Sequence, residues 1–512
     1  MTNRSWIRRA RRVLLAVATA IAFVGLALGT AAPSQAATQE PCDIFGAAGT
    51  PCVAAHSTVR ALFAAYNGPL YQVQRASDST YTNVGVLTAG GVGNAAAQDS
   101  FCASTTCTIT RIYDQTTHHN DLTVEGPGGN GGQDKPANAA ALPITVGGHK
   151  AYGVYIAPGM GYRDNATSGV ATGSMAQDEY MVASGTHVNG GCCFDYGNAE
   201  TSGNDTGNGH MSAINFGTEC WFSPCSGTGP WVQADLENGL FSGGNGSNTN
   251  KKGNNSAFVT ALVKTNGTST YAIKGGNSQS GSLSTWYSGS LPTIGGYIPM
   301  HQEGAIVLGT GGDNSNSSAG SFFEGAMTAT YPSDATDSAV QANITAAGYG
   351  VAATPFTPGA RLSLQATTAC CTSDYIQHDA ADTKVVVAPV TSSSSSTDKA
   401  DATWLVEPGL ANSSCISFQS ANATGQYLRH SDFQLYLQAN DGTTLFAQDA
   451  TFCPQPGNSG QGWSFPSVNY TSKYLRHYNY TLYLAGNGGS NTWDSTTSWS
   501  QDTTWQSATP WS

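Results

Sequence analysis

Two carboxylates, Asp235 and Glu237, stand out as candidates for acid–base chemistry. They alternate with apolar residues over residues 231–238. A strand there would place both carboxyl groups on one face, roughly 7 Å apart. Alternation alone favours a solvated strand face. A pair of acids beside Trp231 is nevertheless unusual in a chain with 11% charged residues, and it suggests paired-carboxylate chemistry.

A third carboxylate, Asp313, follows the apolar run 305–308 and a glycine-rich segment. Glycines let the backbone approach a ligand closely, and they would place Asp313 at the exit of a strand. Ordinary turn chemistry is the simpler interpretation of this segment taken alone. The sequence has no G-x-S-x-G or H-E-x-x-H motif, and none of its ten histidines stands in a local arrangement typical of a nucleophile's base. Acid chemistry by two carboxylates is the hypothesis that remains.

Cys192 and Cys193 are adjacent in the sequence. Neighbouring Cα atoms are about 3.8 Å apart, below the usual disulfide span of about 4.4–6.8 Å, so a bond between them would form a stiff, strained ring that exposes sulfur. Such strain suggests a functional site. The alternative, that each cysteine pairs with a distant partner or stays a buried thiol, is equally compatible with the chemistry.

The first 36 residues are typical of a signal peptide, with five arginines, the apolar run 13–28 and a small-residue cleavage site ending at Ala36. We therefore expect a secreted, extracellular protein. The formal charge moves from −12 to −17 when the leader is removed, since it carries five arginines and no acids. That charge argues against nucleic acid and anionic lipid as partners and favours a neutral substrate. No later segment could span a membrane.

Export makes disulfides the default state of the twelve remaining cysteines. Spacing cannot fix their connectivity, and none has the paired CxxC spacing of a zinc site, so we expect no metal and no cofactor. Nearest-neighbour pairing would join Cys42 with Cys52, Cys102 with Cys107, Cys192 with Cys193, Cys220 with Cys225, Cys370 with Cys371, and Cys415 with Cys453.

Abundant Gly, Ser, Thr and Asn, with 22 Tyr and 10 Trp, predict an all-β protein with short strands and many turns. A Pro/Thr-rich linker over 352–360 separates two expected domains, 41–351 and 361–512. Strand-like runs at 151–156, 258–264, 304–308 and 325–331 suggest a two-sheet sandwich for the first. Helical spacing is limited to residues 57–66 and 338–347.

The second domain contains three repeats of about 50 residues, which predict a β-trefoil. Each repeat has a Tyr-x-x-His segment, ending at His378, His430 and His477, and each closes on an aspartate followed by a small residue, Thr and an aromatic. The repeated aromatic and aliphatic residues fit core positions. Histidine and aspartate are poor core residues, so their recurrence favours a repeated polar pocket. The three aspartates are Asp401, Asp449 and Asp502.

Three long motifs carry a family resemblance: GGCCFDYGNAET over 190–201, WVQADLENGLFSG over 231–243 and EGAIVLGTGGDNS over 303–315. They resemble the α-L-arabinofuranosidases of glycoside hydrolase family 54. The C-terminal repeats resemble carbohydrate-binding module family 42. The resemblance runs from about Pro41 to the C-terminus and implies a concanavalin-like β-sandwich followed by a β-trefoil.

The resemblance also implies an activity: the release of terminal α-L-arabinofuranose from arabinan and arabinoxylan with retention of configuration. It assigns roles in this reaction to individual residues. Glu237 corresponds to the nucleophile and Asp313 to the general acid/base. The sugar would be bound by a Cys192–Cys193 disulfide, by the Trp221 wall, and by Asp235, Asn238 and the backbone of Gly312. Fungal members tend to have a second asparagine where this chain has Gly239, so only a backbone contact could survive there.

In the trefoil, the resemblance implies two sugar pockets. The first repeat has Ala380 where the others have Asp432 and Asn479, so we expect its His378 and Asp401 to bind weakly or not at all. The two expected pockets consist of His430, Asp432, Phe433 and Asp449, and of His477, Asn479, Leu482 and Asp502.

The expected partners are arabinose-bearing plant cell-wall polysaccharides, and we expect a monomer. Two other functions stay open. A non-catalytic polysaccharide-binding protein would keep the trefoil, but we would expect both carboxylates to be substituted. A β-xylosidase or galactofuranosidase would use the same two carboxylates on another sugar.

Overall fold

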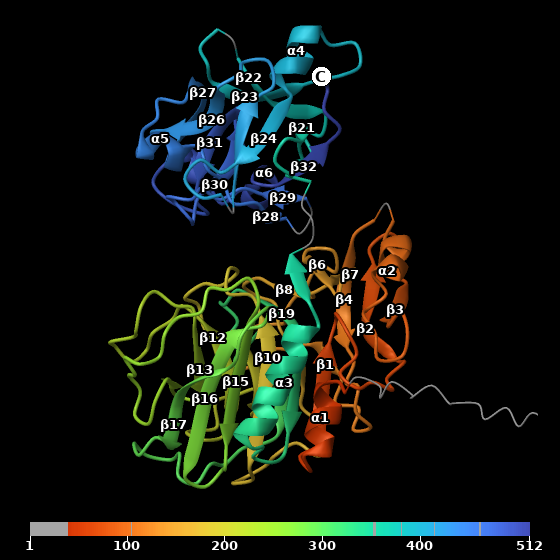
Figure 1. The fold of residues 1–512 in the computed structure, drawn as a ribbon, viewed down its shortest axis with the longest axis vertical. Helices are drawn as coiled ribbons and strands as arrows, with labels where there is room; N and C mark the ends of the chain where they lie inside the picture. The colour runs from red at the N-terminus through yellow and green to blue at the C-terminus, as the bar shows by residue number, and fades with distance from the viewer. Residues whose placement is uncertain (1–38, 104, 352–354, 380, 414, 460–461) are drawn as a thin grey trace, which may run out of the picture. The chain divides into compact units, whose positions relative to one another are not determined.

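The computed structural model describes residues 39–512 except 104, 352–354, 380, 414 and 460–461. The expected signal peptide, the start of the expected linker and Ala380 lie outside the described residues. Within them, the chain is built mainly from antiparallel strands (Figure 1), and no helix there has the length and apolar character needed to cross a membrane. The helices are α1 (Pro41–Ala47), α2 (Ala95–Phe101), α3 (Asp334–Ala346), α4 (Ser396–Asp401), α5 (Thr444–Asp449), α6 (Trp499–Asp502) and the 3₁₀ turn η1 (Thr492–Asp494).

Two large sheets form a β-sandwich. The first has the order β1-β19-β10-β15-β16-β17, with β8 paired to β19. Its strands are β1 (Cys52–Ser57), β8 (Val154–Ile156), β10 (Gln177–Ala183), β15 (Val259–Thr265), β16 (Thr270–Asn277), β17 (Ser284–Ser290) and β19 (Gly320–Thr328).

The second sheet has the order β14-β13-β12-β11-β18-β9-β5-β4-β2-β3. It carries the segments that hold Asp235 and Asp313. Its strands are β2 (Pro69–Arg75), β3 (Tyr81–Gly85), β4 (Cys107–Ile112), β5 (Leu122–Val124), β9 (Tyr162–Asp164), β11 (Asp195–Ala199), β12 (Ser212–Gly217), β13 (Trp231–Asp235), β14 (Leu240–Phe241) and β18 (Ala305–Leu308).

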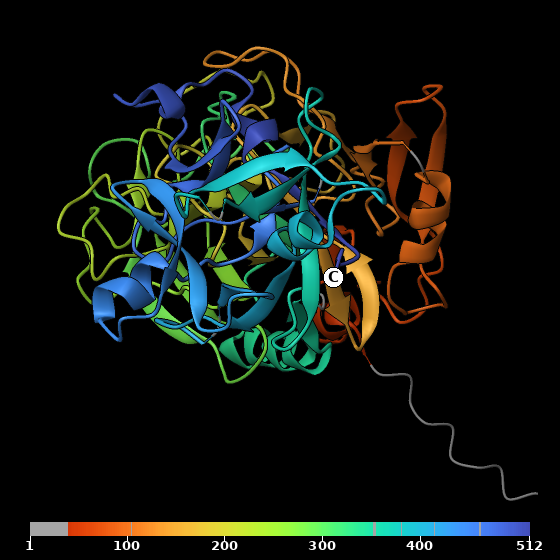
Figure 2. The ribbon, with the colours of Figure 1, turned by 90° about the horizontal axis from the view of Figure 1, so that it is seen from above.

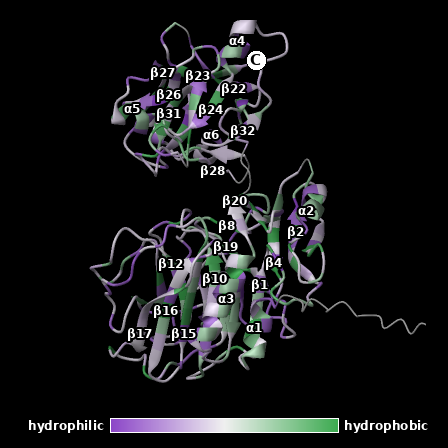
Figure 3. Ribbon diagram, in the orientation of Figure 1, coloured by the Kyte–Doolittle hydropathy of each residue, from purple (hydrophilic) through white to green (hydrophobic). Residues whose placement is uncertain are grey.

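The two sheets share one hydrophobic core. Met181 and Ile273 of the first sheet belong to the same buried cluster as Ile214, Val232 and Leu308 of the second. Every residue of β10, β15 and β19 is buried, and Figure 3 shows apolar residues in green along these strands. A small third sheet, β20 (Tyr349–Val351), β6 (Pro143–Val146) and β7 (His149–Tyr152), adds to this part of the chain.

Strands after residue 360 form a separate β-trefoil, with its own core from all three repeats. Its strands and short helices are drawn in cyan to blue in Figure 2. Phe356, in the expected linker, packs in this core against Phe418 and Phe465. The strands are β21 (Arg361–Ala366), β22 (Asp374–His378), β23 (Val385–Pro389), β24 (Trp404–Pro408), β25 (Ile416–Ser420), β26 (Gln426–Ser431), β27 (Gln434–Ala439), β28 (Gln455–Pro456), β29 (Trp463–Ser464), β30 (Tyr474–Tyr478), β31 (Thr481–Ala485) and β32 (Trp505–Ala508).

Two local predictions need correction. Residues 57–66 form no helix: Val59 and Leu62 are fully buried, and the backbone binds other segments instead, for example through Leu62 N–H to Gln115. Tertiary contacts thus override the helical spacing. The run 151–156 is two strands in different sheets, interrupted at Gly153, where a Cβ atom would lie 2.7 Å from the ring of Phe323. The second predicted helix is present as α3 and begins earlier, at Asp334, after the Ser333 cap.

Candidate active site

Asp235 and Glu237 do not share a strand face, which corrects the first sequence prediction. β13 ends at Asp235, and the chain turns through residues 236–239 into β14. Glu237 and Asn238 have φ angles of 62° and 54°, so both lie in the left-handed region. The physical reason is the tight connection between two paired strands, which alternation in the sequence cannot reveal. Asp235 and Glu237 are both buried, which also excludes a solvated strand face.

Contacts on both sides fix this turn. The Glu237 N–H donates to Oδ1 of Asp235 at 3.0 Å, and Tyr297 Oη donates to the Glu237 carbonyl at 2.8 Å. The Tyr297 ring meets Phe241 edge-on, with centroids 5.0 Å apart. A Cβ atom on Gly239 would lie 2.6 Å from the Phe241 ring, so a side chain here would require this ring to move. The backbone of Glu237 is therefore held from two directions.

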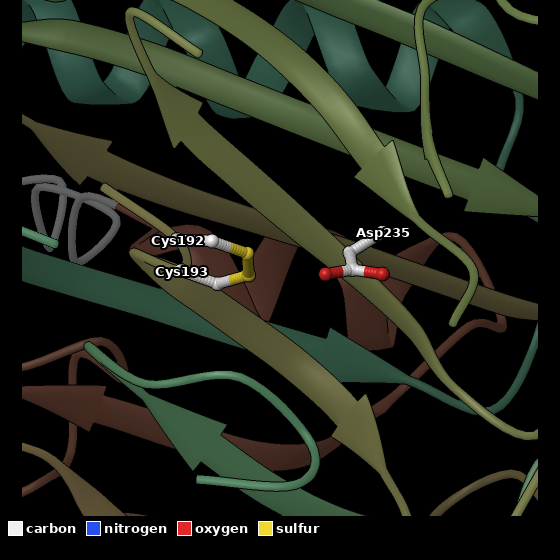
Figure 4. A group of neighbouring side chains, drawn as sticks. All are labelled: Cys192, Cys193 and Asp235. Carbon is white, nitrogen blue, oxygen red and sulfur yellow. A yellow bond between two sulfur atoms is a disulfide. The ribbon is translucent and has the colours of Figure 1, made fainter. Parts of the chain in front are cut away.

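Cys192 and Cys193 are bonded to each other and lie just before β11. Figure 4 shows their sulfur atoms facing the carboxylate of Asp235, and these ligand atoms lie within 4.8 Å of one another. The alternative of distant disulfide partners is thereby excluded. The other ten cysteines also pair with their sequence neighbours. The disulfide thus presents an apolar surface beside a buried acid.

The segment after β18 carries Asp313 and packs against the disulfide. Ser315 donates to Oδ1 of Asp313 through its N–H at 3.0 Å and its hydroxyl at 2.6 Å. The Cys193 N–H donates to the Ser315 carbonyl at 2.9 Å. A Cβ on Gly311 would touch Cys193 at 3.4–3.5 Å. Asp313 therefore has a fixed carboxyl oxygen on a segment bonded to the cysteine pair.

A further acid, Glu200, lies between the two halves of the site, which are the turn that carries Glu237 and the segment that carries Asp313. One carboxylate oxygen of Glu200 and one each of Asp205 and Glu237 lie within 4.8 Å of one another. On the other side, a Cβ on Gly312 would lie 2.0 Å from Oε2 of Glu200, so only glycine fits next to this acid. Glu200, at the end of β11, therefore contacts both the nucleophile candidate and the segment of Asp313.

The crowding of acids raises their pKa values. Burial raises the pKa of Glu237, and the neighbouring charges of Asp235 and Glu200 raise it further. Burial likewise raises the pKa of Glu200. Burial also raises the pKa of Asp235 to about 7, although the Glu237 N–H and Asp195 lower it. These neighbouring carboxyls therefore hold their protons to a higher pH than isolated acids would. By distance, one oxygen each of Glu200, Asp205 and Glu237 could ligate a cation, but acidic groups at such spacing are common without one, and we assign no metal.

Arg163, on β9, links the backbone of both halves. Its Nη1 donates to the Gly312 carbonyl at 2.7 Å and to Oε1 of Glu125 at 3.0 Å, and its Nη2 donates to the Glu200 carbonyl. Nε binds the side chain of Asn165. The side chain is 5% exposed, so these bonds are sheltered from water. One guanidinium therefore holds the residue before Asp313 and the residue beside Glu237 in a fixed relation.

The remaining predicted sugar contacts lie around the turn. Asn238 is exposed and donates to Oδ1 of Asp205 at 3.1 Å. Trp221 is 51% exposed in the loop closed by the Cys220–Cys225 disulfide. Its neighbour Phe222 stacks on Phe241, with centroids 5.2 Å apart, which anchors this loop to the strand after the turn.

The trefoil repeats place each histidine beside its aspartate, with a residue of the following repeat between them. In the second repeat, Oδ1 of Asn469 accepts a hydrogen bond from Nε2 of His430 at 3.1 Å, and Nδ2 of Asn469 donates to Oδ1 of Asp449 at 2.8 Å. Arg429 holds the other oxygen of Asp449 at 2.9 Å. The ring of Tyr470 completes this group, 5.5 Å from the His430 ring.

The third repeat has the same arrangement, but its bridging residue comes from the beginning of the domain. The hydroxyl of Thr368, from the first repeat, lies 2.9 Å from Nε2 of His477 and donates to Oδ1 of Asp502 at 2.8 Å. Arg476 holds the other oxygen of Asp502 at 2.9 Å. Asn479 lines the hollow beside them. Leu482 is fully buried in the core, paired with His477 across the hairpin.

The first repeat keeps the same polar contacts but lacks the arginine. Asn422 lies 3.0 Å from Nε2 of His378 and donates to Asp401 at 2.6 Å. Gln377 stands where the other repeats have arginine. Asp432 and Asn479 both have positive φ, at 48° and 47°, so their recurrence also has a conformational reason, because Asp and Asn tolerate this region.

Comparisons with known proteins give the family of this chain. The family model described as "Alpha-L-arabinofuranosidase B, catalytic" matches residues 41–350, and "Alpha-L-arabinofuranosidase B (ABFB) domain" matches residues 364–507. The chain belongs to the α-L-arabinofuranosidase B family.

Individual members of this family cover most of the chain. A probable α-L-arabinofuranosidase B of Aspergillus clavatus is 55% identical over 86% of this chain and 88% of its own length. An arabinofuranosidase/B-xylosidase of Trichoderma koningii is 54% identical over 85% of this chain and 89% of its own. A crystal structure of an arabinofuranosidase complexed with arabinofuranosyl-α-1,2-xylobiose has a TM-score of 0.68 and 50% identity over 92% of this chain and 100% of its own.

The sequence reasoning missed several residues that these α-L-arabinofuranosidase B folds bring to the sites. Arg163 carried no local signal, since its contacts come from distant segments. Glu200 lies in the motif over 190–201, but nothing in the motif itself marks it as the acid beside Glu237. Asn422 and Asn469 do carry a signal, because both stand in Ser-x-Asn segments 47 residues apart.

Proposed function

We propose that the chain is a secreted, retaining glycoside hydrolase that releases terminal non-reducing α-L-arabinofuranose from arabinan and arabinoxylan. The observation that carries this proposal is the group around Glu237: a buried carboxylate on a backbone held by Asp235 and Tyr297, with Asp235 beside the cysteine pair and the Asp313 segment packed on the same pair. Membership of the family and the sugars named for its relatives supply the substrate class.

In the proposed double displacement, Glu237 attacks the anomeric carbon while Asp313 gives its proton to the departing oxygen. The bond to the leaving group breaks and a glycosyl ester forms on Glu237. Asp313, now ionised, takes a proton from water, and the water oxygen attacks the anomeric carbon to release arabinose and restore both acids. Glu200 sits close enough to Glu237 to hold the proton that the nucleophile must give up before attack.

The other groups bind sugar in this proposal. Asp235, Asn238 and the backbone of Gly239 and Gly312 would bind hydroxyls, while the cysteine pair and Trp221 would contact the apolar face of the ring. In the trefoil, the pocket of His430, Asp432, Phe433 and Asp449 and the pocket of His477, Asn479, Leu482 and Asp502 would hold side-chain arabinose and raise the local concentration of polymer.

We further propose the domain limits given by the sequence, a catalytic domain over 41–351, a linker over 352–360 and a carbohydrate-binding domain over 361–512. Separate hydrophobic cores and separate family matches support this division. Six disulfides support secretion, and we propose that residues 1–36 are removed on export and that the protein acts as a monomer without nucleic acid or membrane partners.

Variants of the two acids test the assignment. Glu237→Gln and Asp313→Asn should each abolish most turnover while the protein stays folded. With azide, Asp313→Ala should give an α-configured arabinofuranosyl azide and Glu237→Ala a β-configured one. The opposite pair of products would exchange the two roles, and full activity in either variant would contradict the mechanism.

A second candidate activity is favoured by one observation: the Trichoderma koningii relative is named an arabinofuranosidase/B-xylosidase. A panel of nitrophenyl α-L-arabinofuranoside, β-D-xyloside and β-D-galactofuranoside would compare the three sugars. We expect the arabinofuranoside to have the highest kcat/KM. Hydrolysis of none of them by the purified protein would favour a non-catalytic polysaccharide-binding protein.

A further inference from the structure

The second trefoil pocket has an aromatic wall on two sides. Phe433 and Tyr470 meet edge-on, with ring centroids 5.2 Å apart, and Tyr470 also meets the ring of His430. Tyr470 directly follows Asn469, the residue that bridges His430 and Asp449. A sugar bound by these polar groups would therefore have apolar surface against its ring carbons.

The third pocket lacks the second of these rings. Tyr480 corresponds to Phe433, because Tyr480 follows Asn479 as Phe433 follows Asp432. Both residues have positive φ, 65° for Tyr480 and 63° for Phe433. The bridging residue is Thr368, and the residue after it is Ala369, which cannot supply the wall that Tyr470 supplies in the second pocket.

The Cys370–Cys371 disulfide stands next to this gap. The Cys371 N–H donates to the Thr368 carbonyl at 2.9 Å, so residues 368–371 form a tight turn anchored at the bridging threonine. Both cysteines line a hollow of about 510 Å³, together with His477, Tyr480 and Asp502. Cys370 is exposed and Cys371 is buried, so the pair lies at the rim of this hollow.

We propose that the Cys370–Cys371 disulfide is the apolar wall of the third pocket, where the proposed function places a terminal furanose. The hydroxyl groups of the sugar would bind Asp502 and His477, and its ring carbons would lie between the disulfide and Tyr480. The same pairing of a disulfide with a buried acid occurs at the active site, where Cys192 and Cys193 lie within 4.8 Å of Asp235. This inference rests on the proposed function, because it requires the trefoil to bind arabinofuranosyl groups.

The test uses the full chain in an Asp449→Ala background, which silences the second pocket. Affinity electrophoresis through arabinoxylan gels then measures retention by the third pocket. Cys370→Ala/Cys371→Ala should lower the affinity about fivefold to tenfold, the loss expected when one apolar contact surface is removed from a small pocket. Cys415→Ala/Cys453→Ala is the matched control, since it removes another trefoil disulfide whose residues do not line the hollow.

A rescue variant distinguishes a disulfide that contacts the sugar from one that only stabilises the turn. Adding Ala369→Tyr to Cys370→Ala/Cys371→Ala should restore part of the retention, because it places a ring where the second pocket has Tyr470. Circular dichroism and thermal unfolding would check that each variant is folded. Rescue by a tyrosine would not be expected if the disulfide only stabilised the turn.

Three results would overturn the inference. If Asp502→Ala abolishes retention but the cysteine double variant does not lower it, the pocket binds sugar without the disulfide. If the cysteine variant and its Cys415/Cys453 control lose retention equally, or if Ala369→Tyr restores nothing in a folded protein, the disulfide acts only on stability. If Asp502→Ala has no effect, the third pocket is not a sugar site, and the proposed function of this pocket fails with the inference.

Discussion

Replacing Arg163 by lysine should impair substrates that need acid catalysis far more than those that do not. The guanidinium binds the carbonyls of Gly312 and Glu200 and the carboxylate of Glu125. Lysine keeps the charge but replaces a planar fork with a single ammonium, so it cannot span the same acceptors. The residue after Gly312 is Asp313, the proposed acid, which should then lose its fixed position.

The expected fall in rate follows from the hydrogen bonds that are lost. One hydrogen bond from a charged donor contributes about 1.5–3 kcal/mol. If that energy holds Asp313 in place for proton transfer, its loss corresponds to about a 10- to 150-fold fall in rate. A xylosyl leaving group requires the proton and should show this fall. A 2,4-dinitrophenolate leaves without protonation and should show much less.

The assay compares kcat/KM for a series of aryl α-L-arabinofuranosides and for an arabinofuranosyl xylo-oligosaccharide. The dependence on leaving-group basicity should become steeper in Arg163→Lys. Arg60→Lys is the matched control, since Arg60 is also buried but pairs with Glu40 and Glu324. An equal fall for all leaving groups would show that Arg163 supports folding or binding in general, and an unchanged oligosaccharide rate would refute the reasoning altogether.

Three further predictions concern other parts of the molecule. Proton NMR of the first-formed sugar should show the α-anomer, and we expect the two catalytic carboxyls to lie about 5–5.5 Å apart; early β-anomer would mean inversion. Cys192→Ala/Cys193→Ala should lower kcat/KM at least severalfold without unfolding the sandwich, whereas unchanged kinetics would remove the disulfide from the site. Burial lowers the pKa of His430 and His477 in the folded protein. The unfolded chain, in which a histidine has a pKa of about 6.5, therefore binds protons more readily than the folded protein does. The free energy of unfolding should accordingly decrease as the pH falls below about 6.5. Thermal unfolding between pH 7 and pH 5 would measure this loss, and His430→Gln/His477→Gln should reduce it; an unchanged pH dependence would contradict the prediction.

The sequence was sufficient for the fold class because composition and repeat spacing act over the whole chain. Turn-forming residues and three similar repeats predict sheets and a trefoil without knowledge of any single contact. It failed at residues 57–66, where Val59 and Leu62 have helical spacing but are buried by distant segments. Local periodicity cannot distinguish these cases, because tertiary contacts decide the backbone conformation.

The candidate site was predictable only where its residues belong to long motifs. Asp313 lies after a strand, as the pattern predicted, but Glu237 lies in a left-handed turn that alternation does not show. Arg163 could not have been found, since the carbonyl it binds at Gly312 is 149 residues away. A hydrogen bond to a backbone atom leaves no sequence signal at the acceptor.

The bridging residues of the trefoil make its pockets the shared property of neighbouring repeats. Asn422 and Asn469 each complete the pocket of the repeat before them, and Thr368 completes the last pocket from the beginning of the domain. A single repeat cut out of this chain would carry a histidine and an aspartate but no intact pocket. Duplicating or deleting one repeat would likewise change two pockets at once. New specificity in such a module therefore has to be engineered, or to evolve, at the contacts between neighbouring repeats as well as within each repeat.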